Sequence, residues 1–118
     1  MEIEHRIIKK VKISAFLNCV KDYGFENIEA NAHALFRLSQ KQRKIFNEET
    51  LKKVLWEEKP LDVGVETNGN YNVVYEYKNG KKLRIITNLS TKKLYIVTFY
   101  FLNKEQEILF ENGKRKKS

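Results

Sequence analysis

Hydrophobic and polar residues follow two different periods along this chain, and the change falls near residue 60. Before that point apolar residues recur every three to four positions, which is typical of helices that bury one face. From Leu61 onward apolar and polar residues alternate, and Val, Ile, Tyr, Phe and Thr become frequent, as they do in strands. The pattern therefore predicts an α+β protein in which helices precede a sheet.

Three helices are expected, over residues 14–23, 29–46 and 48–58. Ser14 is the expected N-cap of the first helix, and Gly24 the residue that ends it with a left-handed backbone. Each of the three carries an apolar stripe at helical spacing, so all three are expected to pack on the same core.

The third helix has the clearest boundaries. Asn47 is its expected N-cap, and Leu51, Val54 and Leu55 form its buried side. The stretch from residue 3 to residue 13 fits both a strand and one face of a helix, and a strand is the preferred interpretation.

Four strands are expected, over residues 61–67, 71–77, 82–88 and 94–102. Short turns separate them, which predicts a four-stranded antiparallel meander. Asn79-Gly80 is the strongest turn signal, because both residue types accept the positive φ of a two-residue type I′ turn.

A two-residue turn at Asn79-Gly80 places Tyr75 opposite Arg84, and an even-membered next loop places Arg84 opposite Val97. One sheet face then mixes rings with cations: Tyr71, Val73, Tyr75, Tyr77, Lys82, Arg84, Ile86, Tyr95, Val97 and Phe99. The other face is mostly aliphatic and is expected to pack on the helices: Val74, Leu83, Ile85, Leu94, Ile96, Thr98 and Tyr100. Rings stack on unpaired bases while Lys and Arg hold phosphates, so the mixed face suits single-stranded RNA. Ordinary cross-strand packing is the alternative interpretation.

At 118 residues the chain has the length of one domain, expected over residues 1–112, with a basic and disordered tail over 113–118. Its net charge of +8 favours binding to polyanions such as RNA, or to an acidic protein. Enrichment in Lys and Glu is also a feature of heat-stable proteins, so the charge alone does not choose between binding and stability.

The remaining composition excludes several classes of function. A single Cys19 forms no internal disulfide, and no apolar stretch approaches the length of a membrane span or a signal peptide, so a cytoplasmic protein without membrane contact is expected. The chain has neither a zinc-ligand pattern nor a Gly-rich phosphate loop, so no metal and no cofactor are expected.

The polar face of the second expected helix gathers a histidine and several cations. His33 and Arg37 are spaced i,i+4, and Lys41 and Lys44 fall on the same third of the helical wheel. A solvated helix face is the alternative interpretation of this group.

The string His33-Ala34-Leu35-Phe36-Arg37-Leu38, followed by Tyr75-Glu76-Tyr77 and Leu94–Tyr100, resembles a family of small RelE-like domains. There a His-Ala-x-x-Arg helix precedes an antiparallel sheet that ends in a Val-Thr-aromatic strand. The resemblance covers roughly residues 30 to 102. It implies kinship with toxin-type ribonucleases of toxin–antitoxin systems, including the RelE and BrnT groups, and hence an acidic antitoxin as partner. The family often has a second Arg before a Gly, where this chain has residues 41–43, Lys-Gln-Arg.

These observations lead to the hypothesis of an RNA-binding or RNA-cleaving domain. If it cleaves RNA, it is a metal-independent endoribonuclease with His33 as acid or base and Arg37 and Arg84 as stabilisers of the transition-state charge. The residues expected to bind RNA are Lys41, Lys44, Tyr75, Tyr77, Lys82 and Tyr95. The rival hypothesis is a non-catalytic module that binds an acidic protein or forms a homodimer through its sheet.

Overall fold

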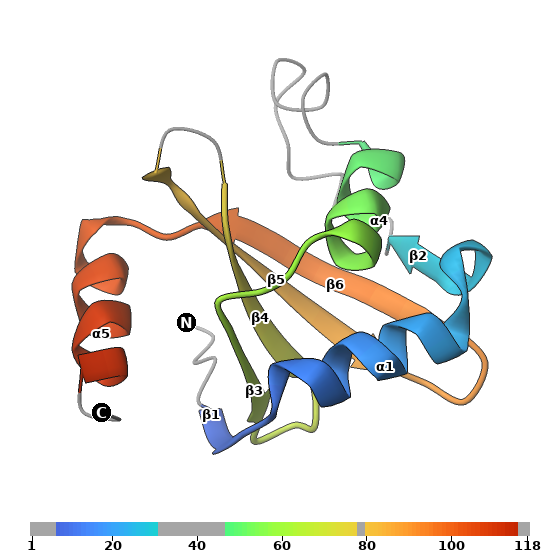
Figure 1. The fold of residues 1–118 in the computed structure, drawn as a ribbon, viewed down its shortest axis with the longest axis horizontal. Helices are drawn as coiled ribbons and strands as arrows, with labels where there is room; N and C mark the ends of the chain where they lie inside the picture. The colour runs from blue at the N-terminus through green and yellow to red at the C-terminus, as the bar shows by residue number, and fades with distance from the viewer. Residues whose placement is uncertain (1–6, 31–46, 78–79, 116–118) are drawn as a thin grey trace.

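The computed structural model describes residues 7–30, 47–77 and 80–115, which form an α+β fold (Figure 1). In chain order the elements are β1 (Ile7–Lys10), α1 (Ile13–Tyr23), the 3-10 helix η1 (Phe25–Asn27), β2 (Ile28–Ala30), α4 (Glu48–Glu57), β3 (Asp62–Glu66), β4 (Tyr71–Glu76), β5 (Lys82–Leu89), β6 (Leu94–Phe101) and α5 (Lys104–Arg115).

The sheet has six strands in the order β1-β3-β4-β5-β6-β2 and is mixed, because β2 runs parallel to β6 while the other neighbours are antiparallel. The expected four-stranded antiparallel meander is therefore wrong as a description of the sheet. Strands β3 to β6 lie where the alternating pattern predicted strands, and β1 agrees with the strand interpretation of the N-terminal stretch. The additional edge strand β2 occupies residues 28–30, where a helix was predicted to begin at Glu29.

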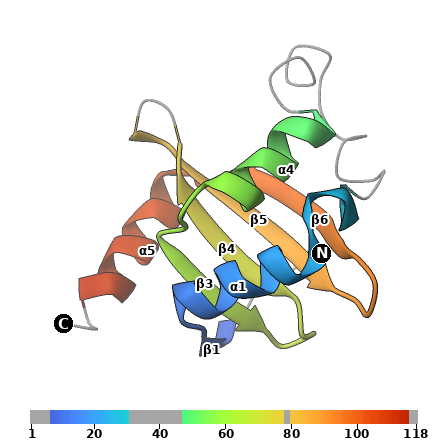
Figure 2. The same ribbon diagram turned by 45° about the vertical axis from the view of Figure 1, so that its right-hand side comes forward.

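Helices α1 and α4 cover one face of this sheet (Figures 1 and 2). Helix α1 buries Phe16 and Val20, as its spacing predicts, and ends at Gly24, whose φ is +85°. The prediction of Ser14 as N-cap is wrong, because the helix begins at Ile13 and its N-cap, Lys12, makes no side-chain cap.

Helix α4 confirms its predicted start and its cap, and it ends at Glu57, one residue before the predicted end. The Asn47 Oδ1 atom accepts a hydrogen bond from the Thr50 amide at 2.8 Å, and two glutamates occupy the first turn. Its apolar stripe of Leu51, Val54 and Leu55 is buried.

The core lies between these two helices and the sheet. Its strand residues are Ile28, Val63, Val73, Tyr75, Leu83, Ile85, Leu94, Ile96 and Phe99. Four of the seven residues expected to pack on the helices do so, namely Leu83, Ile85, Leu94 and Ile96.

The predicted register between β4 and β5 is wrong by one residue. Tyr75 lies opposite Leu83, and Arg84 lies opposite Val74 on one side and Tyr100 on the other. The Tyr77 amide donates to the Lys81 carbonyl at 2.7 Å, which leaves three loop residues instead of two, and Gly80 carries a φ of +72°. A three-residue loop that ends in a left-handed glycine is the next commonest hairpin connection.

Helix α5 was not predicted. A reciprocal capping box starts it: the Gln106 amide donates to the Asn103 Oδ1 atom at 2.8 Å, and the Asn103 amide donates to the Gln106 Oε1 atom at 2.9 Å. The helix extends to Arg115, so the first three residues of the expected tail are helical. None of the helices in the described part of the chain is long and apolar enough to cross a membrane.

Candidate nucleic-acid interface

The register shift separates the rings from the cations of the predicted sheet surface. Tyr75 is 1% exposed within the core, and Tyr77 packs against the core with its ring centroid 5.6 Å from that of Phe101. Burial raises the pKa of the Tyr75 phenol, and the negative charge of Glu58 adds to the shift. Neither tyrosine lies on an open surface that a base could reach together with Arg84.

The cations Lys82 and Arg84 lie on the opposite sheet face. Lys82 forms an ion pair with Glu111 of α5 at 3.5 Å, and an Nη atom of Arg84 donates to the Tyr100 hydroxyl at 3.1 Å. Tyr95 lies half-buried on this face as well. Val74 and Ile86 on this face are 2% and 1% exposed, so its centre is closed to solvent. The predicted grouping of Tyr75 and Tyr77 with Lys82 and Arg84 on one sheet face is therefore wrong, and the RNA-binding roles of these residues stay predictions.

His33, Arg37, Lys41 and Lys44 lie outside the described residues, so their predicted roles stay predictions. Within the described ranges, no group of three or more His, Cys, Asp or Glu residues is placed to hold a metal ion.

A different group of rings and cations lies where α1, η1 and α4 meet. The Trp56 and Phe25 rings are half-buried, with centroids 6.0 Å apart and planes at 74°. Lys21 Nζ lies 3.7 Å from the Trp56 ring centroid, and Lys52 Nζ lies 4.5 Å from that of Phe25. We call these four residues the aromatic–lysine cluster.

Local structure brings each member of the cluster into place. Gly24, with its positive φ, turns the chain after α1 and delivers Phe25 onto α4. Lys52 and Trp56 are four residues apart and therefore share one face of α4. Lys21 also donates to the Trp56 carbonyl at 3.3 Å.

The two lysines of the cluster keep their charge available. No carboxylate among the described residues forms an ion pair with Lys21 or Lys52, whereas the neighbouring Lys53 pairs with Glu49 at 3.8 Å. Partly exposed rings beside unneutralised ammonium groups offer a stacking surface for bases and positive charge for phosphates.

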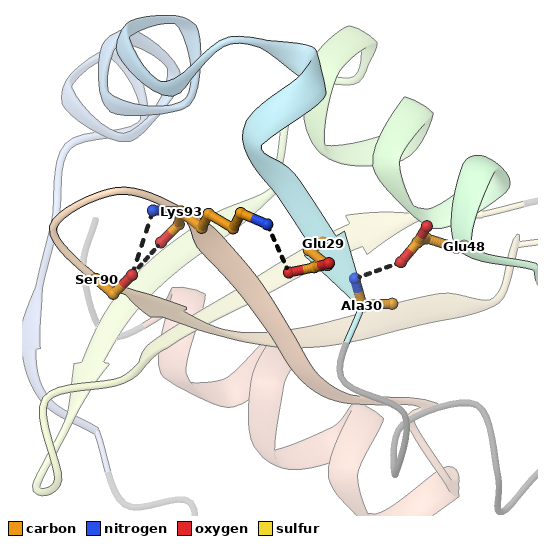
Figure 3. A network of polar contacts seen from close by, with 5 residues as sticks. All are labelled: Glu29, Ala30, Glu48, Ser90 and Lys93. Atoms are coloured by element: carbon orange, nitrogen blue, oxygen red, sulfur yellow. Dashed lines mark hydrogen bonds and ion pairs between the residues drawn. The ribbon is translucent and has the colours of Figure 1, made fainter.

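Polar contacts join β2 to α4 and to the start of β6 (Figure 3). Glu48, in the first turn of α4, accepts a hydrogen bond from the Ala30 amide at 2.9 Å. Glu29 pairs with Lys93 at 3.2 Å, which attaches β2 to the start of β6. The end of β2 and the first turn of α4 therefore lie side by side, and Asn47 is about 8 Å along the helix axis from Lys52.

The net charge of the protein is concentrated in two segments. Residues 31–46 contain four Lys or Arg and no Asp or Glu, and residues 114–117 contain another four. The rest of the chain holds fifteen basic and fifteen acidic residues, so the entire surplus of +8 resides in these two segments. One of them, residues 31–46, directly precedes Asn47, the N-cap of the helix that carries Lys52 and Trp56.

Residues 14–87 match the MJ0788 family. The chain belongs to the MJ0788 family. The match spans α1 through most of β5 and contains the whole aromatic–lysine cluster, while β6 and α5 lie outside it. Neither curated proteins nor solved structures gave a match. The RelE-like resemblance is not tested by the MJ0788 match and stays a prediction.

Sequence reasoning missed Lys21, Phe25, Lys52 and Trp56 in this MJ0788-family protein. The i,i+4 spacing of Lys52 and Trp56 on a predicted helix could have indicated this surface from the sequence, because Trp56 is the only tryptophan and lies off the buried stripe. The contact of this pair with Lys21 and Phe25 could not be predicted from the sequence, because it depends on how α1 packs against α4.

Proposed function

We propose that the protein binds single-stranded RNA through the surface where α1, η1 and α4 meet. The aromatic–lysine cluster is the observation that carries this proposal, because it combines two partly exposed rings with two lysines that lack an ion-pair partner among the described residues. The basic segment 31–46, which directly precedes α4 in the chain, contributes four further positive charges to the protein.

Binding at the cluster follows from the chemistry of its members. Unpaired bases stack on aromatic side chains, and an indole offers the largest ring surface. Lys21 covers one face of Trp56 in the free protein, so an arriving base displaces its ammonium group toward the neighbouring phosphate. Release of counterions from the RNA by these lysines and by the two basic segments makes the affinity depend on salt.

The sole tryptophan permits a direct test. A labelled single-stranded RNA of about ten nucleotides, added in EDTA, should quench Trp56 emission on binding, and the dissociation constant should rise steeply with salt. Trp56→Ala should weaken binding, measured by anisotropy of the label, by about 5- to 150-fold, while Trp56→Phe, which keeps a ring, should lose much less.

Two adjacent lysines of α4 provide a matched control. Lys52→Ala and Lys53→Ala remove the same charge from the same helix, but only Lys52 lies over a ring of the cluster. Lys52→Ala should weaken binding and lower the salt slope by about one unit, and Lys53→Ala should do less of both. Equal effects of the two substitutions would show that net charge alone governs binding and would remove the cluster from the interface.

RNA cleavage is a separate prediction of the RelE-like resemblance. Arg84 lies on the sheet face opposite α1 and α4, so it does not act together with the cluster. His33 and Arg37 remain the candidates, and the same incubation in EDTA tests them. His33→Ala and Arg37→Ala should each reduce cleavage by roughly 100-fold if they act as acid–base and charge-stabilising groups. Intact RNA after incubation with the wild-type protein would leave binding alone, and the absence of binding would favour an acidic protein partner.

A further inference from the structure

Lys21, in the last turn of α1, is held against α4 by two contacts with Trp56. Its Nζ atom lies 3.7 Å from the Trp56 ring centroid and donates a hydrogen bond to the Trp56 carbonyl at 3.3 Å. The ammonium group of Lys52 lies farther from its own ring, 4.5 Å from the centroid of Phe25. Within the aromatic–lysine cluster, Lys21 is therefore the cation that covers a ring most closely.

The carbonyl that Lys21 reaches stands at the C-terminal end of α4, which ends at Glu57. The last carbonyls of a helix have no partner within it and carry a partial negative charge, which favours a nearby cation. For the Trp56 carbonyl, the helical donor would be the amide of residue 60, which is a proline and has no N–H. The helix end and the indole ring thus act on the same ammonium group and keep it over the ring in the free protein.

The place that this ammonium group takes is one that a stacked base needs. Atoms in contact lie about 3.5–4.0 Å apart, so a base on this face of Trp56 would fill the space now taken by the Lys21 Nζ atom. Lys21 is exposed, and its side chain can swing outward from the ring. A phosphate of the arriving strand then offers the ammonium group a new partner, whereas an uncharged aromatic molecule offers none.

We propose that Lys21 regulates the RNA site as a built-in competitor of the base. Its ammonium group closes this face of Trp56 until the phosphates of an RNA strand draw it away. The role rests on the proposed function of the site and adds to it the ligand class that opens the site, a base joined to a phosphate backbone. Lys21 then has two opposite effects on affinity, because it hinders stacking and favours the binding of phosphate.

Salt separates these two effects. The logarithm of the affinity falls linearly with the logarithm of the salt concentration, so extrapolation to about 1 M salt removes the contribution of charge. With the labelled RNA of about ten nucleotides, Lys21→Ala should lower the salt slope by about 0.7. The same variant should raise the extrapolated affinity by about two- to fivefold, the factor that an exposed cation–π contact contributes.

Two further substitutions serve as controls. Lys21→Arg keeps the charge and stacks more strongly on the indole, so the salt slope should stay the same while the extrapolated affinity falls. Lys53→Ala removes the charge of a lysine that pairs with Glu49, and it should leave the extrapolated affinity unchanged. Circular dichroism verifies that each variant is folded. If Lys21 only braced α1 against α4, Lys21→Ala would lower the affinity at every salt concentration.

Trp56→Ala separates failure of this role from failure of the site. If Trp56→Ala binds the RNA as tightly as the wild type, the proposed function is wrong, and the role of Lys21 falls with it. If Trp56→Ala weakens binding but Lys21→Ala leaves the extrapolated affinity unchanged or lowers it, the ammonium group does not compete with the base. The proposed function then stands, and the competitor role alone is overturned.

Discussion

Removal of one buried hydroxyl, by Tyr75→Phe, should stabilise the protein. Tyr75 is 1% exposed, and none of the described residues accepts or donates a hydrogen bond at its Oη atom. An unsatisfied buried polar group costs about 1–3 kcal/mol, whereas the phenylalanine ring keeps the same packing. We therefore expect the free energy of unfolding to rise by about 1 kcal/mol. For 118 residues the unfolding entropy is about 0.25 kcal/mol/K, so the melting temperature should rise by about 4 °C.

A second tyrosine supplies the matched control for this change. The Tyr23 hydroxyl donates to the Ser90 carbonyl, so Tyr23→Phe removes a hydrogen bond and should lower the stability by about 1 kcal/mol. Thermal and urea unfolding followed by circular dichroism measure both variants. If Tyr75→Phe destabilises the protein as much as Tyr23→Phe does, the hydroxyl of Tyr75 has a partner and the reasoning is wrong. RNA binding by folded Tyr75→Phe protein should equal that of the wild type, because the residue lies in the core.

Three further predictions concern pH and local structure. Burial raises the pKa of Tyr75 and of Tyr23 above the ordinary value of 10.0, so the stability that they contribute is complete below pH 10 and is lost as the pH rises further. Alkaline unfolding should therefore shift to higher pH in Tyr75→Phe, and an unchanged midpoint would contradict this. Asn47→Ala removes the α4 cap and should lower the free energy of unfolding, measured in urea, by about 1 kcal/mol. Asn68→Ala, in a turn, serves as the comparison. Gly80→Val should cost more than about 1 kcal/mol, because a β-branched residue resists a φ of +72° although the added Cβ meets no atom within 4 Å; an unchanged melting temperature would refute this.

The elements with strong local signals followed from the sequence alone. In α4, an N-capping Asn47, acids in the first turn and a regular apolar stripe all act within a few residues of one another. Strands β3 to β6 are likewise predicted by the alternation of apolar and polar residues, which is the same in every register. Fold class and the positions of these elements were predictable for that reason.

The register of the β4–β5 hairpin was decided by tertiary structure. Both a two-residue and a three-residue loop satisfy the positive φ of Gly80, and both keep the alternation of the strands. A shift of one residue, however, exchanges Val74 for Tyr75 as the β4 residue that shares the face beneath the helices with Leu83. The choice depends on how Val73 and Tyr75 pack with Leu83 in the core under the helices, and the alternation within each strand does not contain this information.

The other features that the sequence did not predict also depend on contacts between distant parts of the chain. Strand β2 is three residues long, too short to show a period, and it exists because Ile28–Ala30 pair with residues 94–96 of β6. The aromatic–lysine cluster forms because α1 packs on α4 and brings Lys21 to Trp56. A local pattern predicts which residues lie on one face of a helix or strand. The residues that this face contacts depend on the burial of surfaces far apart in the sequence.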